Sequence, residues 1–265
     1  MKKIKVPNHI VNLCRNQKKY EIRVANTREK LILNTFIFLA DEIEKEYFKS
    51  DEIKSFKDKI TEIIDGKFKA KLQQTLFHVA TLNINQFIDY FQQKVFNRTL
   101  NLEQIQGIKS KLLDKFLNKY VGESVTNISS SVKEILNSKI SQYTQDGLNF
   151  NDMVKQIVVD TKGTIGKKRA RIIARTETAK AIGETNFQTA YKAGLKNKTW
   201  IHAGGGKTNR KSHLALHGVT IKITKYFDVP AENQYTPATK MRFPRDPLCR
   251  EAGHIVNCYC QINYS

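Results

Sequence analysis

The chain has 265 residues, and 45 Lys and Arg against 25 Asp and Glu give it a formal net charge of +20. Hydrophobic residues make up 40% of the sequence, which is enough for a core and excludes a wholly disordered chain. The most apolar window, residues 31–40, is too short to cross a membrane, and four cysteines are too few for a disulfide scaffold. The charge favours a polyanionic partner such as DNA or RNA.

The first part of the chain, residues 1–147, is predicted to be entirely helical, because apolar residues recur there at intervals of three and four. The expected helices cover residues 21–49, 50–66, 67–98, 101–122 and 124–143. Ser50 and Asn101 are the expected starts of two of them, and Gly66 and Gly122 the expected ends. The lengths favour an elongated or bundle-like α-domain.

The second part, residues 148–265, is predicted to be a small domain with one long helix and a short antiparallel sheet. A short helix at 153–160 and a polar connector at 161–168 precede the long helix, which covers 168–193 and ends at Gly194. Extended segments and a short helix at 211–216 follow. The predicted fold class is therefore α+β, with an all-α region first and the mixed domain after it.

Histidine and cysteine side chains crowd the C-terminus. His254 precedes Cys258 by four residues, Cys258 and Cys260 bracket one residue, and His213 on the short helix is able to complete a tetrahedral set. Imidazole and thiolate are the ligands that zinc prefers, so these four residues predict a structural zinc site. On a strand, a Cys-X-Cys pair presents both sulfurs to the same face. Two packed thiols beside a hydrogen-bonded histidine, or a catalytic Cys–His pair, remain alternatives.

Several basic residues are candidates for contact with DNA phosphates. The segment at 204–209 is glycine-rich but lacks the first glycine of a phosphate-binding loop, since position 201 is Ile201, so nucleotide binding is disfavoured. The sequence contains no basic ribbon interleaved with aromatic residues, which favours phosphate contacts over base readout. The candidates are Lys167, Lys168, Lys207, Arg210 and Lys211.

Residues 145–265 resemble the phage Mu F-like minor head proteins, also called phage head morphogenesis proteins. The resemblance begins with the helix at 173–194 and continues through an Arg-x-x-His step, a Pro-x-Asp step and a closing Asn-Cys-x-Cys. The positions that carry it include Arg175, Glu177, Trp200, Arg210, His213, Pro244, Asp246, Asn257, Cys258 and Cys260.

The resemblance implies a minor capsid protein of a tailed phage with no enzymatic activity. Such a protein lies inside the head near the portal protein, after assembly in the host cytoplasm, and some family members are thought to leave with the genome. Its expected partners are the portal protein, the major capsid or scaffolding protein, and double-stranded DNA bound without sequence specificity. The alternatives are a metal-dependent nuclease or other DNA-acting enzyme that uses the His and Cys cluster, and a basic DNA-binding protein without a capsid role.

Overall fold

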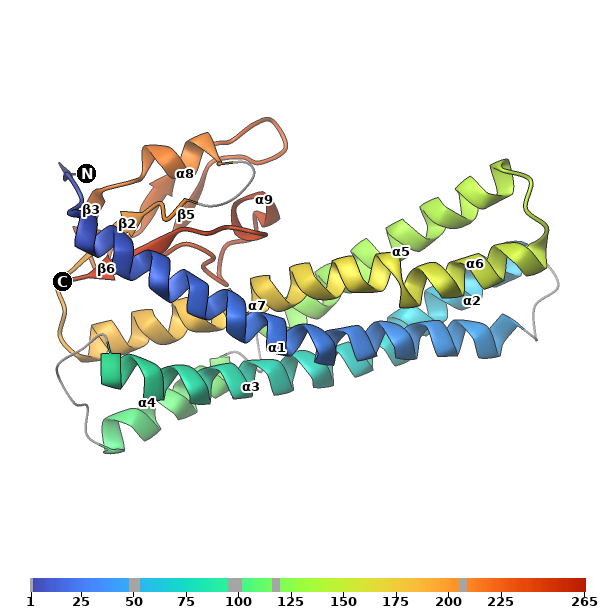
Figure 1. The fold of residues 1–265 in the computed structure, drawn as a ribbon, viewed down its shortest axis with the longest axis horizontal. Helices are drawn as coiled ribbons and strands as arrows, with labels where there is room; N and C mark the ends of the chain where they lie inside the picture. Colours follow the sequence, from blue (N-terminus) through green and yellow to red (C-terminus); the bar gives the residue numbers. More distant parts are fainter. Residues whose placement is uncertain (1, 48–52, 95–101, 116–119, 205–208) are drawn as a thin grey trace. The chain divides into compact units, whose positions relative to one another are not determined.

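The computed structural model describes residues 2–47, 53–94, 102–115, 120–204 and 209–265 (Figure 1). The chain divides into two compact units that are interleaved along the sequence. The unit called here the mixed unit comprises Met1–Asn26, Ala80–Lys115 and Arg175–Ser265, and the helical unit comprises Thr27–Val79 and Phe116–Ala174. The α+β class is confirmed, whereas the domain boundary expected between residues 147 and 148 stays a prediction.

Long helices account for most of the described residues before position 193. They are α1 (Asn8–Tyr47), α2 (Ile53–Ile63), the π-helical segment η1 (Ile64–Phe68), α3 (Lys69–Lys94), α4 (Leu102–Lys115), α5 (Val121–Gln145), α6 (Phe150–Lys162) and α7 (Thr164–Lys192). The last part of the chain contains short elements. They are β2 (Asn197–Ile201), α8 (Lys211–Ala215), β3 (Val219–Lys222), β4 (Phe227–Val229), β5 (Thr239–Met241), α9 (Ala252–Ile255) and β6 (Gln261–Tyr264), and the N-terminal strand β1 (Lys2–Lys3) pairs with them.

Several expected helix ends are wrong. The chain passes Gly66 within η1 without a break, and Gly122 lies in the first turn of α5. Glycine weakens a helix by only about 1 kcal/mol relative to alanine, which burial of neighbours such as Ile64 and Phe68 outweighs. The connector expected at 161–168 reduces to Gly163, because α7 begins at Thr164. The starts expected at Ser50 and Asn101 lie outside the described residues.

The helical unit has an apolar core. Ile32, Phe36, Leu39 and Ile43 of α1 are fully buried, as their spacing predicts. Helices α2, α3, α5 and α6 add further aliphatic residues to the same cluster, and the rings of Phe36 and Phe68 lie 5.6 Å apart. The predicted helical periodicity is therefore confirmed as a core stripe.

The mixed unit contains a four-stranded antiparallel sheet in the order β1-β3-β2-β6 and a separate hairpin of β4 and β5 (Figure 1). In the sheet, Trp200 of β2 lies opposite Ile262 of β6. Gly218 precedes β3 with a φ of +80°, and a Cβ there would lie 2.3 Å from the Ile4 carbonyl oxygen. Only glycine allows the N-terminal segment to approach the sheet so closely.

The end of α7 is confirmed. Gly194 adopts a φ of +76°, and the N–H of Leu195 donates to the carbonyl of Ala190 at 3.1 Å. This pattern is typical of a glycine-terminated helix, and it directs the chain into β2.

Candidate metal centre

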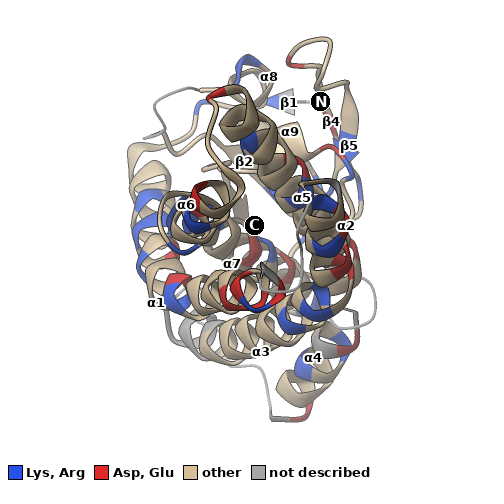
Figure 2. Cartoon of the chain, turned by 90° about the vertical axis from the view of Figure 1, so that its right-hand side faces the viewer, with Lys and Arg blue, Asp and Glu red and all other residues tan. Residues whose placement is uncertain are grey.

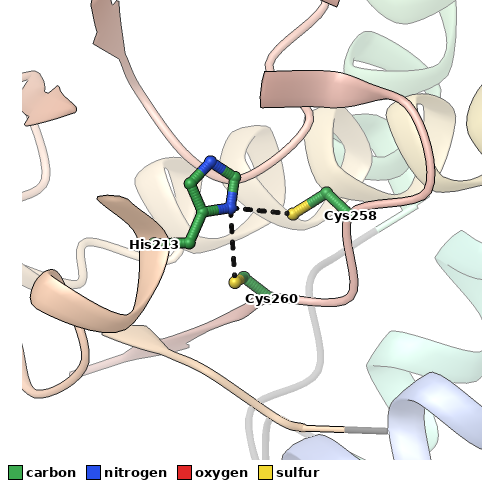
Figure 3. Close-up of side chains that lie close together, drawn as sticks. All are labelled: His213, Cys258 and Cys260. Carbon is green, nitrogen blue, oxygen red and sulfur yellow. Dashed lines mark hydrogen bonds between the residues drawn. The ribbon is translucent and has the colours of Figure 1, made fainter. Parts of the chain in front are cut away.

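Three predicted ligands meet in the mixed unit: His213, Cys258 and Cys260 (Figure 3). The Nδ1 atom of His213 lies 3.4 Å from the Cys258 Sγ and 3.7 Å from the Cys260 Sγ. The three potential ligand atoms all lie within 4.8 Å of one another. The exposed fractions of the three residues are 1%, 5% and 2%, so the cluster is closed to solvent.

Local structure explains how each ligand is held. His213 lies on α8, whose first N–H groups, those of Lys211 and Ser212, donate to the carboxylate of Glu232 at 3.0 and 2.9 Å. Asn257 adopts a φ of +54°, a conformation that asparagine tolerates better than most residues. This turn leads the chain from α9 to Cys258.

The expectation that both cysteines lie on one strand is wrong. Cys258 and Cys260 precede β6, which begins at Gln261. The irregular backbone after Asn257 nevertheless turns both sulfur atoms toward His213 (Figure 3). The i, i+2 spacing brings the thiols together without strand geometry.

Trp200 forms a wall of the cluster. Its side chain is fully buried, and its ring meets the His213 ring edge-on at 5.3 Å between centroids. The same ring packs against Phe227 at 5.2 Å. Trp200 is the single tryptophan of the chain, so its fluorescence reports on this site.

Two further histidines lie beside the three ligands. His254, a predicted ligand, contacts His213 instead of the thiols: its Nδ1 lies 3.3 Å from His213 Nε2, and its Nε2 lies 2.9 Å from the Pro237 carbonyl oxygen. His202, which the sequence analysis missed, lies just after β2 with its Nδ1 3.5 Å from the Cys260 Sγ. The sequence offers no local signal for His202, because the contact joins residues 58 positions apart.

The two thiols have opposite pKa shifts. The hydrogen bond from Cys260, aided by His213 and opposed by burial, holds the pKa of Cys258 well below its usual value. The same hydrogen bond and burial raise the pKa of Cys260 well above its usual value. Zinc binds cysteine as the thiolate, so zinc binding at this pair would be coupled to the release of thiol protons.

Buried ion pairs hold the segment around the site. The guanidinium of Arg242 donates to both carboxylate oxygens of Glu184 at 3.2 and 2.6 Å and to Asp246 at 2.6 Å. Burial lowers the pKa of Arg242, but Asp246 and Glu184 together raise it above its usual value. Asp246 also accepts from the Leu248 N–H at 3.0 Å, so it organises the turn in which it lies.

A second buried pair ties α1 to the site. Arg245 donates to Glu21 at 2.9 Å, and Gln261 donates to the same carboxylate oxygen at 2.9 Å. Arg245 adopts a φ of +62°, which is rare for a long side chain and is held here by the ion pair. Sequence analysis missed this contact because Glu21 and Arg245 are 224 residues apart.

Three other residues that carry the family resemblance, Arg175, Asn257 and Glu177, lie outside the cluster of ligands. Arg175 and Asn257 line a small pocket that Cys258 also borders. Glu177 forms an ion pair with Lys180 at 2.9 Å on α7. Glu184, which lies on the same helix, forms the buried pair with Arg242.

The candidate DNA contacts are placed as follows. Lys167 and Lys168 on α7 and Lys211 on α8 are exposed, and Lys207 lies outside the described residues. Arg210 is half-buried and donates to the Val256 carbonyl at 2.6 Å, which holds the segment that leads to Cys258.

Within the described parts of the chain, none of the helices has the length and hydropathy that a membrane span requires. A family model described as "Phage Mu protein F like protein" matches residues 134–263, a range that includes α7 and all three clustered ligands. No curated protein and no solved structure matches the chain.

Proposed function

We propose that this protein is a minor component of a tailed-phage head, because residues 134–263 match the Phage Mu protein F like family. In this proposal it assembles in the host cytoplasm, associates with the portal protein on the inside of the head and becomes part of the virion. The family match over residues 134–263 is the observation that carries the proposal. The major capsid or scaffolding protein is a further candidate partner.

Association with the portal is testable by co-sedimentation. The purified chain is mixed with portal rings of the same phage at several salt concentrations, and an unrelated ring of similar acidity serves as the control for nonspecific binding. The proposal expects selective co-sedimentation with the portal that persists as the salt concentration rises. Absence of association at every salt concentration contradicts it.

We also propose that the protein contacts packaged double-stranded DNA through phosphates. The net charge of +20 supports this, since a polyanion relieves repulsion among like charges. Lys and Arg are distributed over several helices, among them α1, α2 and α5, with Asp and Glu between them (Figure 2). A dispersed distribution of this kind favours contact without sequence specificity.

The exposed pair on α7 allows a matched DNA-binding test. The double substitution of Lys167→Ala and Lys168→Ala is expected to reduce the slope of log affinity against log salt by up to about 1.8, or ~0.9 for each lost phosphate contact. The control replaces Lys222 and Lys225, which are also exposed, and removes the same charge. Equal effects of the two double variants would contradict a localised contact at Lys167 and Lys168.

The donor set of the cluster fits a structural zinc ion. Two thiols and one imidazole approach each other closely, and zinc prefers sulfur and nitrogen ligands in closed tetrahedral sites. We propose that zinc bound here stabilises the mixed unit by joining α8 to the segment before β6. Elemental analysis of the purified protein should find one zinc per chain. Zinc-free protein whose cysteines all react with a thiol reagent in the native state would contradict this proposal.

A metal-dependent nuclease is the alternative function, and burial disfavours it. A catalytic zinc keeps one coordination position open to substrate, whereas His213, Cys258 and Cys260 are each at most 5% exposed. A nuclease assay with added divalent metals, on the wild type and on His213→Ala, tests this alternative. Cleavage that the substitution abolishes would overturn the structural assignment.

A further inference from the structure

We infer that His202 is the fourth ligand of the metal centre, and that His254 positions His213 without touching the ion. This inference rests on the proposed zinc site. It replaces the ligand set expected from the sequence, which included His254, and it follows from the hydrogen bonds that fix the tautomers of the three histidines.

The tautomer of His213 is fixed by a chain of acceptors. The Pro237 carbonyl can only accept, so the Nε2 of His254, 2.9 Å away, carries the proton. In the neutral ring the Nδ1 of His254 is then an acceptor, and the Nε2 of His213, 3.3 Å away, donates to it. The Nδ1 of His213 therefore has a free lone pair, and this is the atom that faces both sulfurs.

Hydrogen bonds fix the tautomer of His202 in the same way. The Oδ1 of Asn209 accepts a hydrogen bond from its Nε2 at 3.2 Å, which leaves a lone pair on the Nδ1 that faces Cys260. The backbone N–H of His202 donates to the Nδ1 of His217 at 3.1 Å and fixes the main chain at this point. A hydrogen bond on the nitrogen that does not bind metal is the usual support for a histidine ligand.

Three of the four sulfur–nitrogen distances agree with a tetrahedral ion. Zinc–sulfur and zinc–nitrogen bonds of about 2.3 and 2.1 Å place tetrahedral sulfur and nitrogen ligands about 3.6 Å apart. The Nδ1 of His213 lies 3.4 Å and 3.7 Å from the two sulfurs, and the Nδ1 of His202 lies 3.5 Å from the Cys260 Sγ. His202 is outside the group of three residues whose ligand atoms all lie within 4.8 Å of one another, so its ring moves toward Cys258 when the ion binds.

His254 has no free lone pair to offer a metal ion. Its Nε2 donates to Pro237 and its Nδ1 accepts from His213, so both ring nitrogens are occupied. The stacked rings of His213 and His254, 5.4 Å apart between centroids, keep this arrangement in place. His254 therefore acts on the ion only by orienting His213.

Cobalt(II) substitution distinguishes a ligand from a positioning residue. Apoprotein is titrated with Co²⁺, and the sulfur-to-cobalt charge-transfer absorption is compared among wild type, His202→Cys and His254→Cys. A third thiolate ligand in His202→Cys is expected to increase this absorption by about half, while His254→Cys leaves it at the two-thiolate level. An increase in His254→Cys and none in His202→Cys would overturn the inference.

Metal affinity supplies the second measurement. His202→Ala is expected to weaken Co²⁺ and Zn²⁺ binding at least 100-fold and to lose the four-coordinate spectrum. His254→Ala should weaken binding about 10- to 100-fold with the spectrum retained, and His254→Asn, whose Oδ1 can accept from His213, should restore it. Exposed His78 provides the control His78→Ala.

These measurements distinguish an error in the assignment of His202 from an error in the zinc proposal. If wild-type protein binds neither Co²⁺ nor Zn²⁺, the zinc proposal itself is wrong. If wild type binds the metal and His202→Ala binds it equally tightly with the same spectrum, only the assignment of His202 is wrong.

Discussion

The two compact units bury different kinds of side chain. The core of the helical unit is aliphatic and aromatic, and among the described residues of this unit Glu42 is the one buried charged side chain. The mixed unit buries many more: Glu21, Glu184, Lys198, Arg242, Arg245 and Asp246 are each at most 8% exposed.

The two units are therefore specified by their sequences in different ways. An apolar core tolerates changes that preserve volume, because dispersion and burial are not directional. Buried charges and thiols require particular partners at particular distances. Removing one partner of a buried ion pair leaves the charge of the other partner buried and uncompensated. Substitutions in the two units should therefore lower the free energy of unfolding for different reasons.

Among single substitutions, a change at Arg242 should destabilise the protein most. Arg242→Met leaves the carboxylates of Glu184 and Asp246 buried without their cation, which should reduce the free energy of unfolding by about 3–5 kcal/mol. Urea unfolding followed by Trp200 fluorescence measures this loss.

Lys240→Ala is the matched control for Arg242→Met. Lys240 pairs with Asp228, but their side chains are 75% and 67% exposed, so no measurable loss is expected. Equal losses for both variants would remove the distinction between buried and exposed pairs.

A core substitution tests the helical unit. Leu136 of α5 is fully buried in the apolar cluster, so Leu136→Ala should cost about 3 kcal/mol through lost burial and an unfilled cavity. Hydrogen exchange is expected to accelerate in α5 while zinc content and native Trp200 emission stay unchanged. Loss of bound zinc in this variant would show that the metal centre depends on the apolar core.

A smaller effect is expected at Lys198, which is fully buried with no hydrogen-bond partner for its Nζ among the described residues. Burial, aided by the charge of Arg242, lowers the pKa of this ammonium to about 7. The unfolded chain therefore binds more protons between pH of about 7 and 10, and the free energy of unfolding should rise with pH across that window.

Lys198→Met checks this dependence. The substitution removes an unsatisfied polar group and should stabilise the protein by roughly 1–3 kcal/mol at pH 7. Urea unfolding of wild type and variant at pH 7 and pH 9 compares them, and the difference should shrink at pH 9. A variant that is less stable than wild type at pH 7 would mean that the contacts of Lys198 with the rings of Phe187 and Phe227 outweigh its desolvation.

The helices of the helical unit were largely predictable, because the spacing of apolar residues along a short stretch of sequence determines them. The spacing of Ile32, Phe36 and Leu39 is sufficient to place a helix and its buried face. The errors arose at Gly66 and Gly122, where a weak local preference was overridden by packing around it.

The site was predictable only in part. Cys258 and Cys260 are neighbours in sequence, and His213 lies in a short motif, so residue type and spacing were enough to bring them together. His202 and the Glu21–Arg245 pair depend on contacts between distant segments. The burial of Glu184 does have a local signal in the sequence, since Glu184 follows buried Ala181 by three residues and so shares the buried face of α7.

The metal dependence of Trp200 fluorescence decides whether the mixed unit is held together by its metal centre. Chelator-treated protein is titrated with Zn²⁺ while the emission of this single, fully buried tryptophan is recorded. The expected result is a shift of emission to shorter wavelength that saturates at one zinc per chain, because a bound ion would fix His213, the ring against which Trp200 packs. Emission that is already at the buried wavelength without metal, and that zinc does not change, would contradict a structural role for the site.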